Sequence, residues 1–448
     1  MKTKAIILAA GKGTRMKSDL PKVLHKAMGK TMVEWAMNSV ALVDEKPAVV
    51  IGYGKELIKE TLGDRAYYAI QDEQKGTGHA VMMAQEYIKE TDYVVVTYGD
   101  MILLKQESIK KLLDFTQENN LSAVMLTAIA DDPTGLGRIV KDDSGHVLKI
   151  VEHRDASPEE LEINEINTGV FCFKSNELID ALGKLDCNNS QGEYYLTDTV
   201  EIINKAGGKI GSIIIDAHEA LGTNDRYQLS LSAKELRYRI NKDHMVGGVT
   251  IIDPDTTYID AGVEIGNDTV IYPGCVIEGN TKIGERCRLY GASNIKDAQI
   301  ADDVEIKAST IEKSYVDNKS KIGPNAYLRP KSKIGKDCKV GDFVEIKNST
   351  IGDNTKISHL TYVGDADVGN NVNLGCGVVI VNYDGKNKHR TKIKDNAFIG
   401  CNTNLVSPVS VGENAYTAAG STITDDVPNN TLAIARSRQI NKEGWTKP

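Results

Sequence analysis

The chain has 448 residues, of which 41% are hydrophobic and 26% are charged, and its formal net charge is −8. This length exceeds one ordinary hydrophobic core, so we expect two or three domains of a soluble globular protein. The negative charge argues against non-specific nucleic-acid binding as the main role, and no apolar run approaches the roughly 18 residues of a membrane span.

The seven cysteines form no C-x-x-C pair and no His/Cys spacing typical of a metal site. Cys275, Cys287 and Cys338 fall at small positions of the repeat described below, where a thiol acts as a small hydrophobic group. We therefore expect neither a disulfide framework nor a zinc site. A reducing cytoplasm fits this pattern, and the apolar run at residues 5–10 is too short for a signal peptide.

The first half alternates strand-like and helix-like segments. Continuous apolar runs predict strands at 4–9, 47–51, 66–70 and 93–98, and helical spacing predicts helices at 31–42, 55–62 and 78–88. This βαβ order predicts an α/β domain with a doubly wound, Rossmann-like parallel sheet. Such sheets bind ligands at the carboxyl ends of their strands.

Residues 11–16 form a glycine-rich loop directly after the first predicted strand. Its two glycines allow backbone N–H groups to approach phosphate oxygens, while Lys12 and Arg15 add positive charge, as does Lys22 further along. The loop lacks the G-K-[ST] of a P-loop and the third glycine of the dinucleotide fingerprint. Taken alone, it is explained equally well as a simple turn.

Further polar clusters follow later strands. Residues 71–78 lead into a predicted helix, for which an N-cap is the simpler explanation. Asp100 follows the strand at 93–98, where a carboxylate is well placed to hold Mg²⁺ between phosphates, although an isolated Asp is more often a turn residue. Neutral Asn side chains and one Glu, suited to sugar hydroxyls and an acetamido group, occur in the segments 135–138, 151–153, 166–169 and 222–226.

Residues 225–246 have the apolar spacing of a helix that joins two halves, with Asn224 as a possible N-cap and two glycines at its end. We therefore expect three parts. These are a domain at 1–224, a helical linker at 225–246, and a second domain at 247–448.

From residue 259 to 423, aliphatic residues recur every six positions, and glycine often follows them, as in Ile334-Gly335 and Ile351-Gly352. A period of six fits neither a helix nor an ordinary strand, which repeat every 3.6 and 2 residues. It fits an all-β parallel β-helix of hexapeptide repeats, in which aliphatic side chains fill a prism and glycines turn its corners with positive φ. If three hexads make a coil, Arg329 and Lys347, 18 positions apart, stack into a cationic strip suited to a sugar phosphate.

The six-residue rhythm breaks between Ile295 and Ile322, near residues 358–362, and at 382–390, a polar insertion that we expect to leave the coil as a loop. A β-helix needs no chemistry, so functional residues are expected at such departures. A single histidine such as His359 is usually a bystander. Here its neighbours within a few coils include other candidate side chains, namely Arg329, Lys347, Tyr362, Asn373, Asn382 and Tyr383.

The first half resembles the sugar-phosphate nucleotidyltransferases through L-A-A-G-K-G-T-R-M at 8–16. G-T-G-H-A at 76–80, Y-G-D at 98–100 and E-I-N-T-G at 165–169 are similar to N-acetylglucosamine-1-phosphate uridyltransferases. The resemblance implies contacts to UTP and the sugar nucleotide at Leu8, Ala9, Ala10, Gly11, Lys22, Gln71, Gly76, Thr77, Gly137, Glu152, Asn167 and Asn224. It also implies Mg²⁺ ligands at Asp100 and Asn224, and catalytic roles for Arg15 and Lys22 against the phosphates.

The second half resembles the left-handed β-helix acyltransferases. H-L-T-Y-x-G-D at 359–365 and N-Y-D-G at 382–385 are similar to glucosamine-1-phosphate N-acetyltransferases, in which the residue matching His359 is the general base. Sugar-phosphate contacts are implied at Arg329, Lys347, Tyr362 and Asn373, and acetyl-CoA contacts at Cys376, Asn382, Tyr383, Cys401, Ala419 and Arg436. Cys376 and Cys401 stand where the family often has Ala and Ser.

Together the halves resemble the bifunctional bacterial enzymes that make UDP-N-acetylglucosamine for peptidoglycan and lipopolysaccharide precursors. The resemblance covers nearly the whole chain. It implies acetyl-CoA-dependent acetylation of glucosamine 1-phosphate, then Mg²⁺-dependent uridylyl transfer from UTP, in a cytoplasmic homotrimer that binds neither nucleic acid nor membrane. In the alternative hypothesis only the first half is catalytic, and the β-helix is a trimerisation or regulatory scaffold. The residues around His359 favour two activities, since a scaffold needs none of them.

Overall fold

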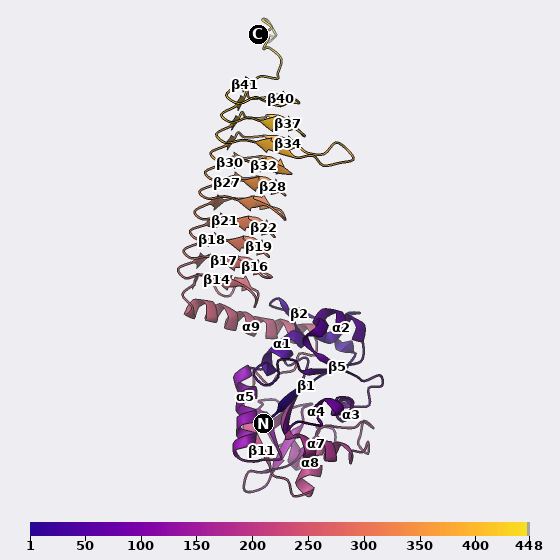
Figure 1. The fold of residues 1–448 in the computed structure, drawn as a ribbon. Coiled ribbons are helices and arrows are strands. Elements are labelled where there is room, and N and C mark those ends of the chain that lie inside the picture. Colours follow the sequence, from indigo (N-terminus) through magenta and orange to yellow (C-terminus); the bar gives the residue numbers. More distant parts are fainter. Residues whose placement is uncertain (446–448) are drawn as a thin grey trace. The chain divides into compact units, whose positions relative to one another are not determined.

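The computed structural model describes residues 1–445, and the chain forms two compact units, Met1–Leu236 and Arg237–Pro448 (Figure 1). Within the described residues, no helix is both long and apolar enough to cross a membrane. The first unit is an α/β domain and the second is a β-helix, as the sequence predicts.

The first unit is built on one mixed sheet with the central strand order β11-β7-β10-β6-β1-β4-β5. These strands are β1 (Thr3–Ala9), β4 (Ala48–Ile51), β5 (Tyr67–Ile70), β6 (Tyr93–Tyr98), β7 (Ala123–Ile129), β10 (Glu165–Lys174) and β11 (Ile210–Ile214). Two antiparallel strands, β8 (Arg138–Lys141) and β9 (Val147–Val151), extend it beside β10. Alternating side chains of β1 enter two core clusters on opposite faces of the sheet, Ile6 and Leu8 in one and Ala5, Ile7 and Ala9 in the other.

The four strands that the sequence predicts are parallel, as expected, but the whole sheet is mixed. The pairs of β1 with β4, β1 with β6, and β4 with β5 are parallel, but β10 runs antiparallel to both β6 and β7. A buried apolar run reveals that a strand is covered on both faces, and it carries no information about strand direction.

The helices of the first unit are α1 (Met32–Val40), α2 (Lys55–Leu62), α3 (Thr77–Met83), α4 (Gln85–Ile88), α5 (Gln106–Glu118), α6 (Pro158–Leu161), α7 (Ser175–Leu182) and α8 (Asp198–Lys205). A reciprocal capping box between Thr31 and Glu34 starts α1. The helix predicted at 78–88 is instead two helices, because Ala84 leaves helical geometry between them. Short 3₁₀ turns lie at η1 (Thr14–Met16), η2 (Lys22–Leu24) and η3 (Gly63–Arg65), and β2 (Lys26–Ala27) pairs with β3 (Lys30–Thr31).

Helix α9 spans Arg226–Val246, as the predicted linker helix requires. Its first part belongs to the first unit, where Leu236 packs in a cluster with Met16 and Ile102. Its second part belongs to the second unit, where Asn241 donates hydrogen bonds to the carbonyl oxygens of Pro254 and Thr257. The predicted N-cap at Asn224 is wrong, since the carboxylate of the next residue, Asp225, accepts the N–H of Gln228 at 2.8 Å.

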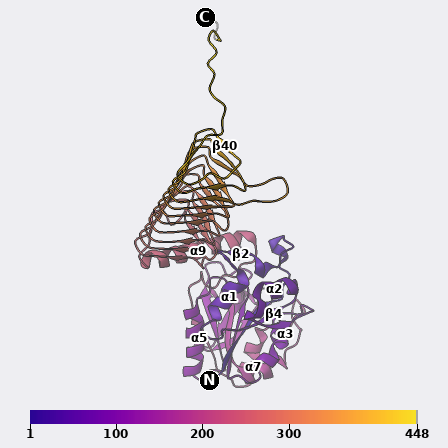
Figure 2. The ribbon, with the colours of Figure 1, turned by 45° about the horizontal axis from the view of Figure 1, so that its top comes forward.

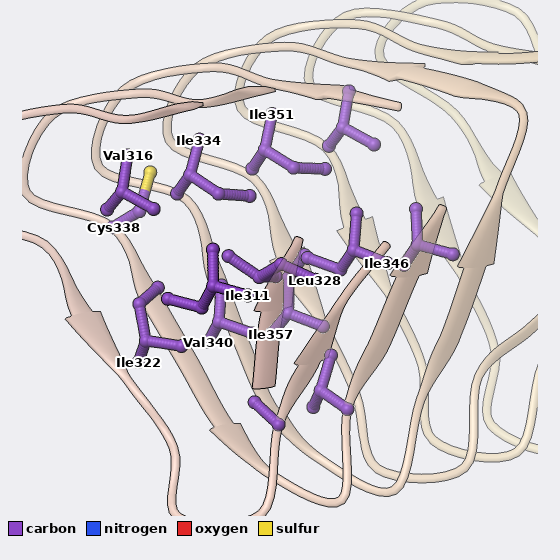
Figure 3. Packing of buried hydrophobic residues seen from close by; sticks show 14 of the residues in the cluster. Ile311, Val316, Ile322, Leu328, Ile334, Cys338, Val340, Ile346, Ile351 and Ile357 are labelled. Atoms are coloured by element: carbon purple, nitrogen blue, oxygen red, sulfur yellow. The ribbon is translucent and has the colours of Figure 1, made fainter. Parts of the chain in front are cut away.

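The second unit consists of short parallel strands from β12 (Thr250–Ile251) to β41 (Leu432–Ala433), stacked into sheets of 11, 10 and 9 strands. Figure 2 shows the successive coils as a stack of triangular rungs. In one sheet Ile322 pairs with Val340, and in the next Leu328 pairs with Ile346, each 18 positions later. These side chains and their counterparts from the third sheet fill the prism (Figure 3). The stacking of coils by three hexads is thereby confirmed.

The first break in the rhythm has no loop. Ile295 pairs with Ile311 and Ile306 pairs with Ile322, each 16 positions later, so a shorter coil absorbs the slip in register. The third break behaves as predicted. Val368 pairs with Ile393, 25 positions later, and the extra residues leave the coil after β34 (Val379–Val381) as the projecting loop in Figure 1.

The predicted reason for most of the corner glycines is wrong. Gly335 and Gly352 do not have positive φ, which falls instead on Asp337 and Asn354, two positions later. A Cβ at Gly335 would lie 2.5 Å from Asp353 Oδ1, and one at Gly352 would lie 2.5 Å from the carbonyl carbon of Gly369 on the next coil. Glycine is therefore required there by the close approach of the neighbouring coil.

Candidate functional sites

A pocket of about 320 Å³ lies at the carboxyl end of β1. It is lined by ten of the residues predicted to contact UTP, phosphate or Mg²⁺, namely Leu8, Ala9, Ala10, Gly11, Arg15, Lys22, Gln71, Gly76, Thr77 and Asp100. Six further residues, to which the resemblance assigns no individual contact, also line it: Gly13, Val23, Gln74, Ala80, Tyr98 and Glu193. Most of these lie within a few residues of a predicted position, and Glu193 comes from a distant loop that carries no motif.

The glycine-rich loop at 11–16 leaves room for a ligand and for a lysine. Nothing lies within 4 Å of the position that a Cβ would take on Gly11, which faces open space. Gly13 has φ +64, and a Cβ on it would lie 2.4 Å from the Cβ of Lys22. The absence of a side chain at Gly13 thus allows the stem of Lys22 to pack against the loop.

The ammonium group of Lys22 lies between two oxygen atoms from distant parts of the chain. It forms an ion pair with Asp100 Oδ2 and donates to Asn224 Oδ1 at 2.8 Å, and Arg15 Nη2 donates to the same Asn224 oxygen at 2.7 Å. The Lys22 and Asp100 side chains are 13% and 19% exposed. Carboxylate and amide oxygens that converge on one cation are also the ligands that a hard divalent cation prefers.

Gly137, Glu152 and Asn167 lie together, outside the lining of this pocket. A Cβ on Gly137 would be 3.5 Å from Glu152 Oε1 and 3.6 Å from Asn167 Cβ, and the N–H of Asn167 donates to the Gly137 carbonyl at 2.9 Å. Burial, and then the charge of Asp155, raises the pKa of Glu152.

Tyr98 connects these three residues with the pocket. It lines the pocket, and burial followed by the charges of Glu152 and Asp100 raises its pKa. A Cβ on Gly169 would lie 2.2 Å from the Tyr98 ring, so glycine at this position accommodates the ring.

In the second unit, Arg329 and Lys347 lie on neighbouring coils, as the repeat predicts. Arg329 follows β25 (Tyr327–Leu328), Lys347 ends β28 (Glu345–Lys347), and the N–H of Arg329 donates to the Ile346 carbonyl at 2.8 Å. Arg329 Nη1 lies 2.8 Å from Glu345 Oε1, and Lys347 Nζ lies 3.3 Å from Asp365 Oδ2. Each cation therefore keeps one carboxylate partner.

Lys388 joins this strip from the projecting loop, and the sequence analysis missed it. The neighbouring ammonium group of Lys347, and further the charge of Arg329, lower the pKa of Lys388. Tyr362, on β31 (Tyr362–Gly364), also lies beside the strip. A Cβ on Gly364, which pairs with Lys347, would lie 2.4 Å from the Tyr362 phenol oxygen. A third cation beside two others is unfavourable without an anion, so the strip is suited to phosphate.

The loop is a hairpin whose base is tied to Asp365. The side-chain amides of Asn382 and Asn348 both donate to the Asp365 carboxylate. Burial opposes ionisation of Asp365, but these hydrogen bonds and the Lys347 ion pair outweigh it and lower its pKa. Within the loop, Asp384 accepts the N–H groups of Lys386 and Asn387 at 2.7 and 2.6 Å.

His359 ends β30 (Lys356–His359), directly above Asp342 at the end of β27 (Lys339–Asp342). Its Nδ1 lies 3.6 Å from Asp342 Oδ2, and its side chain is 54% exposed. Asn373 begins the adjacent strand β33 (Asn373–Leu374) and pairs with Lys356. Asp342 was not predicted, because it lies 17 positions before His359 and the regular spacing of 18 points to Gly341 instead.

Cys376, Cys401 and Ala419 occupy one corner on successive coils. The Cys376 carbonyl accepts the N–H of Asn402, and the Cys401 carbonyl accepts that of Gly420, both at 2.8 Å. Cys376 is half-buried and Cys401 is exposed. Tyr383 is exposed on the hairpin, and Arg436 lies in the exposed segment after β41. Within residues 1–445, no hydrogen bond or ion pair joins Arg436 to the other predicted residues.

Comparison with known families divides the chain as the fold does. Residues 5–189 match the MobA-like NTP transferase domain, residues 262–297 and 390–425 match the bacterial transferase hexapeptide, and residues 310–387 match the GMPPB C-terminal domain. Similar curated proteins span both units. The Bifunctional protein GlmU of Acetivibrio thermocellus is 58% identical over 98% of this chain and 96% of its own. Those of Clostridium botulinum and Clostridium beijerinckii are 54% and 53% identical, over 98% of this chain and 97% of theirs.

Proposed function

The chain belongs to the family of bifunctional GlmU proteins, and we propose that it makes UDP-N-acetylglucosamine in two consecutive reactions. The β-helix transfers an acetyl group from acetyl-CoA to the amine of glucosamine 1-phosphate. The first unit then joins the product to UTP and releases pyrophosphate. The sugar nucleotide feeds peptidoglycan and lipopolysaccharide precursors. We assign the uridyltransferase to residues 1–224, the helical linker to 225–246 and the acetyltransferase to 247–448.

In uridylyl transfer, the phosphate oxygen of N-acetylglucosamine 1-phosphate attacks the α-phosphorus of UTP, and the bond to pyrophosphate breaks. Arg15 and Lys22, which converge beside Asn224, neutralise the charge that grows on the phosphate oxygens. Asp100 and Asn224 hold Mg²⁺, which supplies further charge neutralisation when bound. This assignment is supported by the fact that Asp100 Oδ2 and Asn224 Oδ1 both contact the ammonium group of Lys22.

Nucleotide and sugar occupy different parts of this site. The backbone of residues 8–11, with Gln71, Gly76 and Thr77, contacts UTP at the pocket wall. Gly137, Glu152 and Asn167 contact the sugar. Their carboxylate and amide groups offer hydrogen bonds to hydroxyls and to the acetamido group, and they meet the pocket at Tyr98.

In acetyl transfer, the glucosamine nitrogen attacks the thioester carbonyl of acetyl-CoA, the carbon–sulfur bond breaks, and coenzyme A leaves as the thiol. His359 accepts the proton that the amine loses, and the Asp342 carboxylate, 3.6 Å from Nδ1, stabilises the positive charge that the ring gains. Arg329, Lys347 and Lys388 hold the sugar phosphate, together with Tyr362 and Asn373. Acetyl-CoA lies against the hairpin and the nearby corner, at Cys376, Asn382, Tyr383, Cys401, Ala419 and Arg436.

One observation carries the acetyltransferase assignment. Three cations, Arg329, Lys347 and Lys388, lie close together next to the coils of His359. Ion pairs with Glu345 and Asp365 neutralise Arg329 and Lys347. A scaffold that only joins subunits has no need of this arrangement, whereas a sugar phosphate neutralises it. The alternative, a uridyltransferase with a scaffold β-helix, leaves the hairpin and its lysine without a role.

The decisive experiment supplies the purified chain with glucosamine 1-phosphate and acetyl-CoA and follows the release of free thiol. Pyrophosphate release from UTP and N-acetylglucosamine 1-phosphate is measured in parallel. We expect both products. Uridylyl transfer without thiol release above background would establish the scaffold alternative, and omission of Mg²⁺ should abolish only pyrophosphate release.

We further propose a cytoplasmic homotrimer that acts on small molecules rather than on nucleic acid or membranes. The flat faces of a triangular β-helix are suited to packing around a three-fold axis, and UTP and acetyl-CoA are intracellular substrates. Sedimentation equilibrium should give three times the chain mass of 48.8 kDa. A monomer at micromolar concentration would contradict this proposal.

A further inference from the structure

Two acceptors fix the orientation of the Gln71 side-chain amide at the pocket wall. Gln71 follows β5, is 3% exposed, and has Nε2 at 3.1 Å from the Gly76 carbonyl oxygen and 3.0 Å from His79 Nδ1. A carbonyl oxygen only accepts hydrogen bonds, so the nitrogen of the amide must face Gly76. Both N–H groups of Gln71 are then used, one toward Gly76 and one toward His79.

His79 must therefore present a lone pair at Nδ1, which requires the neutral imidazole with its proton on Nε2. His79 lies on α3 and does not line the pocket. In the part of the chain that the structure describes, no hydrogen bond engages Gln71 Oε1. This oxygen is the one acceptor that the amide has left for a ligand in the pocket.

We infer that His79 is a positioning residue that selects the nucleobase, by holding Gln71 Oε1 toward the pocket as an acceptor for a ring N–H. The inference rests on the proposed UTP contact at Gln71. Uracil carries a hydrogen on N3, which Oε1 accepts, whereas N3 of cytosine has only a lone pair, which Oε1 repels. A site built to accept one hydrogen bond rejects an analogue that lacks the donor.

The hydrogen bond between Gln71 and His79 depends on the protonation state of the imidazole. Besides Gln71, it faces Glu73 in the preceding loop and the ring of Tyr194, whose centroid lies 6.4 Å away. A protonated His79 would turn an N–H toward the N–H of Gln71 and release the amide from its orientation. Protonation of this ring should therefore lower the preference for UTP over CTP.

The test measures kcat/KM for UTP and CTP with N-acetylglucosamine 1-phosphate, using the full chain. His79→Leu removes the acceptor and should lower the UTP/CTP ratio about tenfold, mainly by raising KM for UTP. His79→Asn places an amide oxygen where Nδ1 was and should keep the ratio within about threefold. His218→Leu, at an exposed histidine far along the chain, is the matched control and should leave the ratio unchanged.

Double substitution separates this inference from the proposed function. Gln71→Ala should lower the ratio by itself, and adding His79→Leu should lower it no further. If Gln71→Ala lowers the ratio but His79→Leu does not, or if the two effects multiply, His79 has no positioning role. If Gln71→Ala leaves the ratio intact, the proposed contact between Gln71 and uracil is wrong.

A change of pH provides a second test, on the wild-type chain and one conservative variant. The wild-type UTP/CTP ratio is measured between pH 5 and pH 8, beside that of His79→Asn. We expect the wild-type ratio to fall toward acid pH while the ratio of the Asn variant stays level. A ratio that changes with pH to the same extent in the wild-type chain and in His79→Asn would overturn the inference.

Discussion

The two units bring their candidate functional side chains together in different ways. In the first unit, Lys22 reaches Asp100, 78 positions away, and Asn224, 202 positions away, because a sheet places their loops at one edge. In the second unit, Arg329 and Lys347 are 18 positions apart, and the stacking of one coil on the next places them side by side. The difference teaches that a repeat converts sequence spacing into spatial distance, whereas a mixed sheet does not.

The comparison predicts that each site can be destroyed without harm to the other. The largest effect is expected for His359→Ala, which removes the proposed general base and should reduce acetyl transfer about 10²–10⁴-fold. Uridylyl transfer by the same sample should be unchanged. Loss of both activities together would indicate a folding defect and would contradict the independence of the two sites.

The reciprocal change is Asp100→Ala, which removes a carboxylate beside Lys22 and Asn224. We expect pyrophosphate release to fall about 10²–10³-fold, since a group that organises charge at the phosphates is lost. Thiol release should be unaffected. Asp72→Ala is the matched control, because Asp72 is exposed and pairs with Lys55 outside the proposed metal site.

A smaller effect is expected on the hairpin of the β-helix. Lys388→Ala should raise KM for glucosamine 1-phosphate about tenfold and change kcat little, as for a lost charged hydrogen bond to phosphate. Lys386→Ala, on the same hairpin, should leave both constants near the wild-type values. Equal effects of the two substitutions would mean that the hairpin supplies only general positive charge.

The smallest effect concerns stability. The pKa of Asp365 is lowered from its ordinary value of 3.8, so its contribution to stability is present above about pH 4 and is lost as the pH falls through the folded-state value. Asp365→Asn should lower the free energy of unfolding of the β-helix at pH 7 by about 1–3 kcal/mol. In denaturant titrations, the difference in unfolding free energy between wild type and Asp365→Asn should shrink below pH 4. A difference that does not change with pH would contradict this role of the Asp365 carboxylate.

The sequence was most informative about what repeats. The six-residue period predicted the β-helix, the stacking of Arg329 on Lys347, and the departure of a loop at residues 382–390. The same arithmetic would have placed Gly341 beneath His359, whereas the structure pairs His359 with Asp342, because this coil is one residue short of three hexads. The prediction that corner glycines such as Gly335 need positive φ was wrong. The six-residue period shows that glycine is required at the corner, but it does not show whether positive φ or a close neighbouring coil is the reason.

In the first unit, the sequence predicted elements better than their arrangement. The strands at β1, β4, β5 and β6 and the helix α2 followed from apolar patterns, and the antiparallel direction of β10 did not. The grouping of Gly137 with Glu152 and Asn167 depended on a resemblance, and the structure brings the three together outside the pocket. Their functional roles remain predictions.

The sequence by itself determined which residues are buried, which coils stack, and which segments are polar enough for chemistry, because these properties depend on local patterns of hydrophobicity. Only the tertiary structure decided that Lys22 lies between Asp100 and Asn224, that Lys388 folds back toward Lys347, and that His79 holds the amide of Gln71. The first two contacts close long or irregular loops, whose ends no local pattern specifies. The third depends on the orientation of one side chain, which is set by the hydrogen-bond acceptors around it.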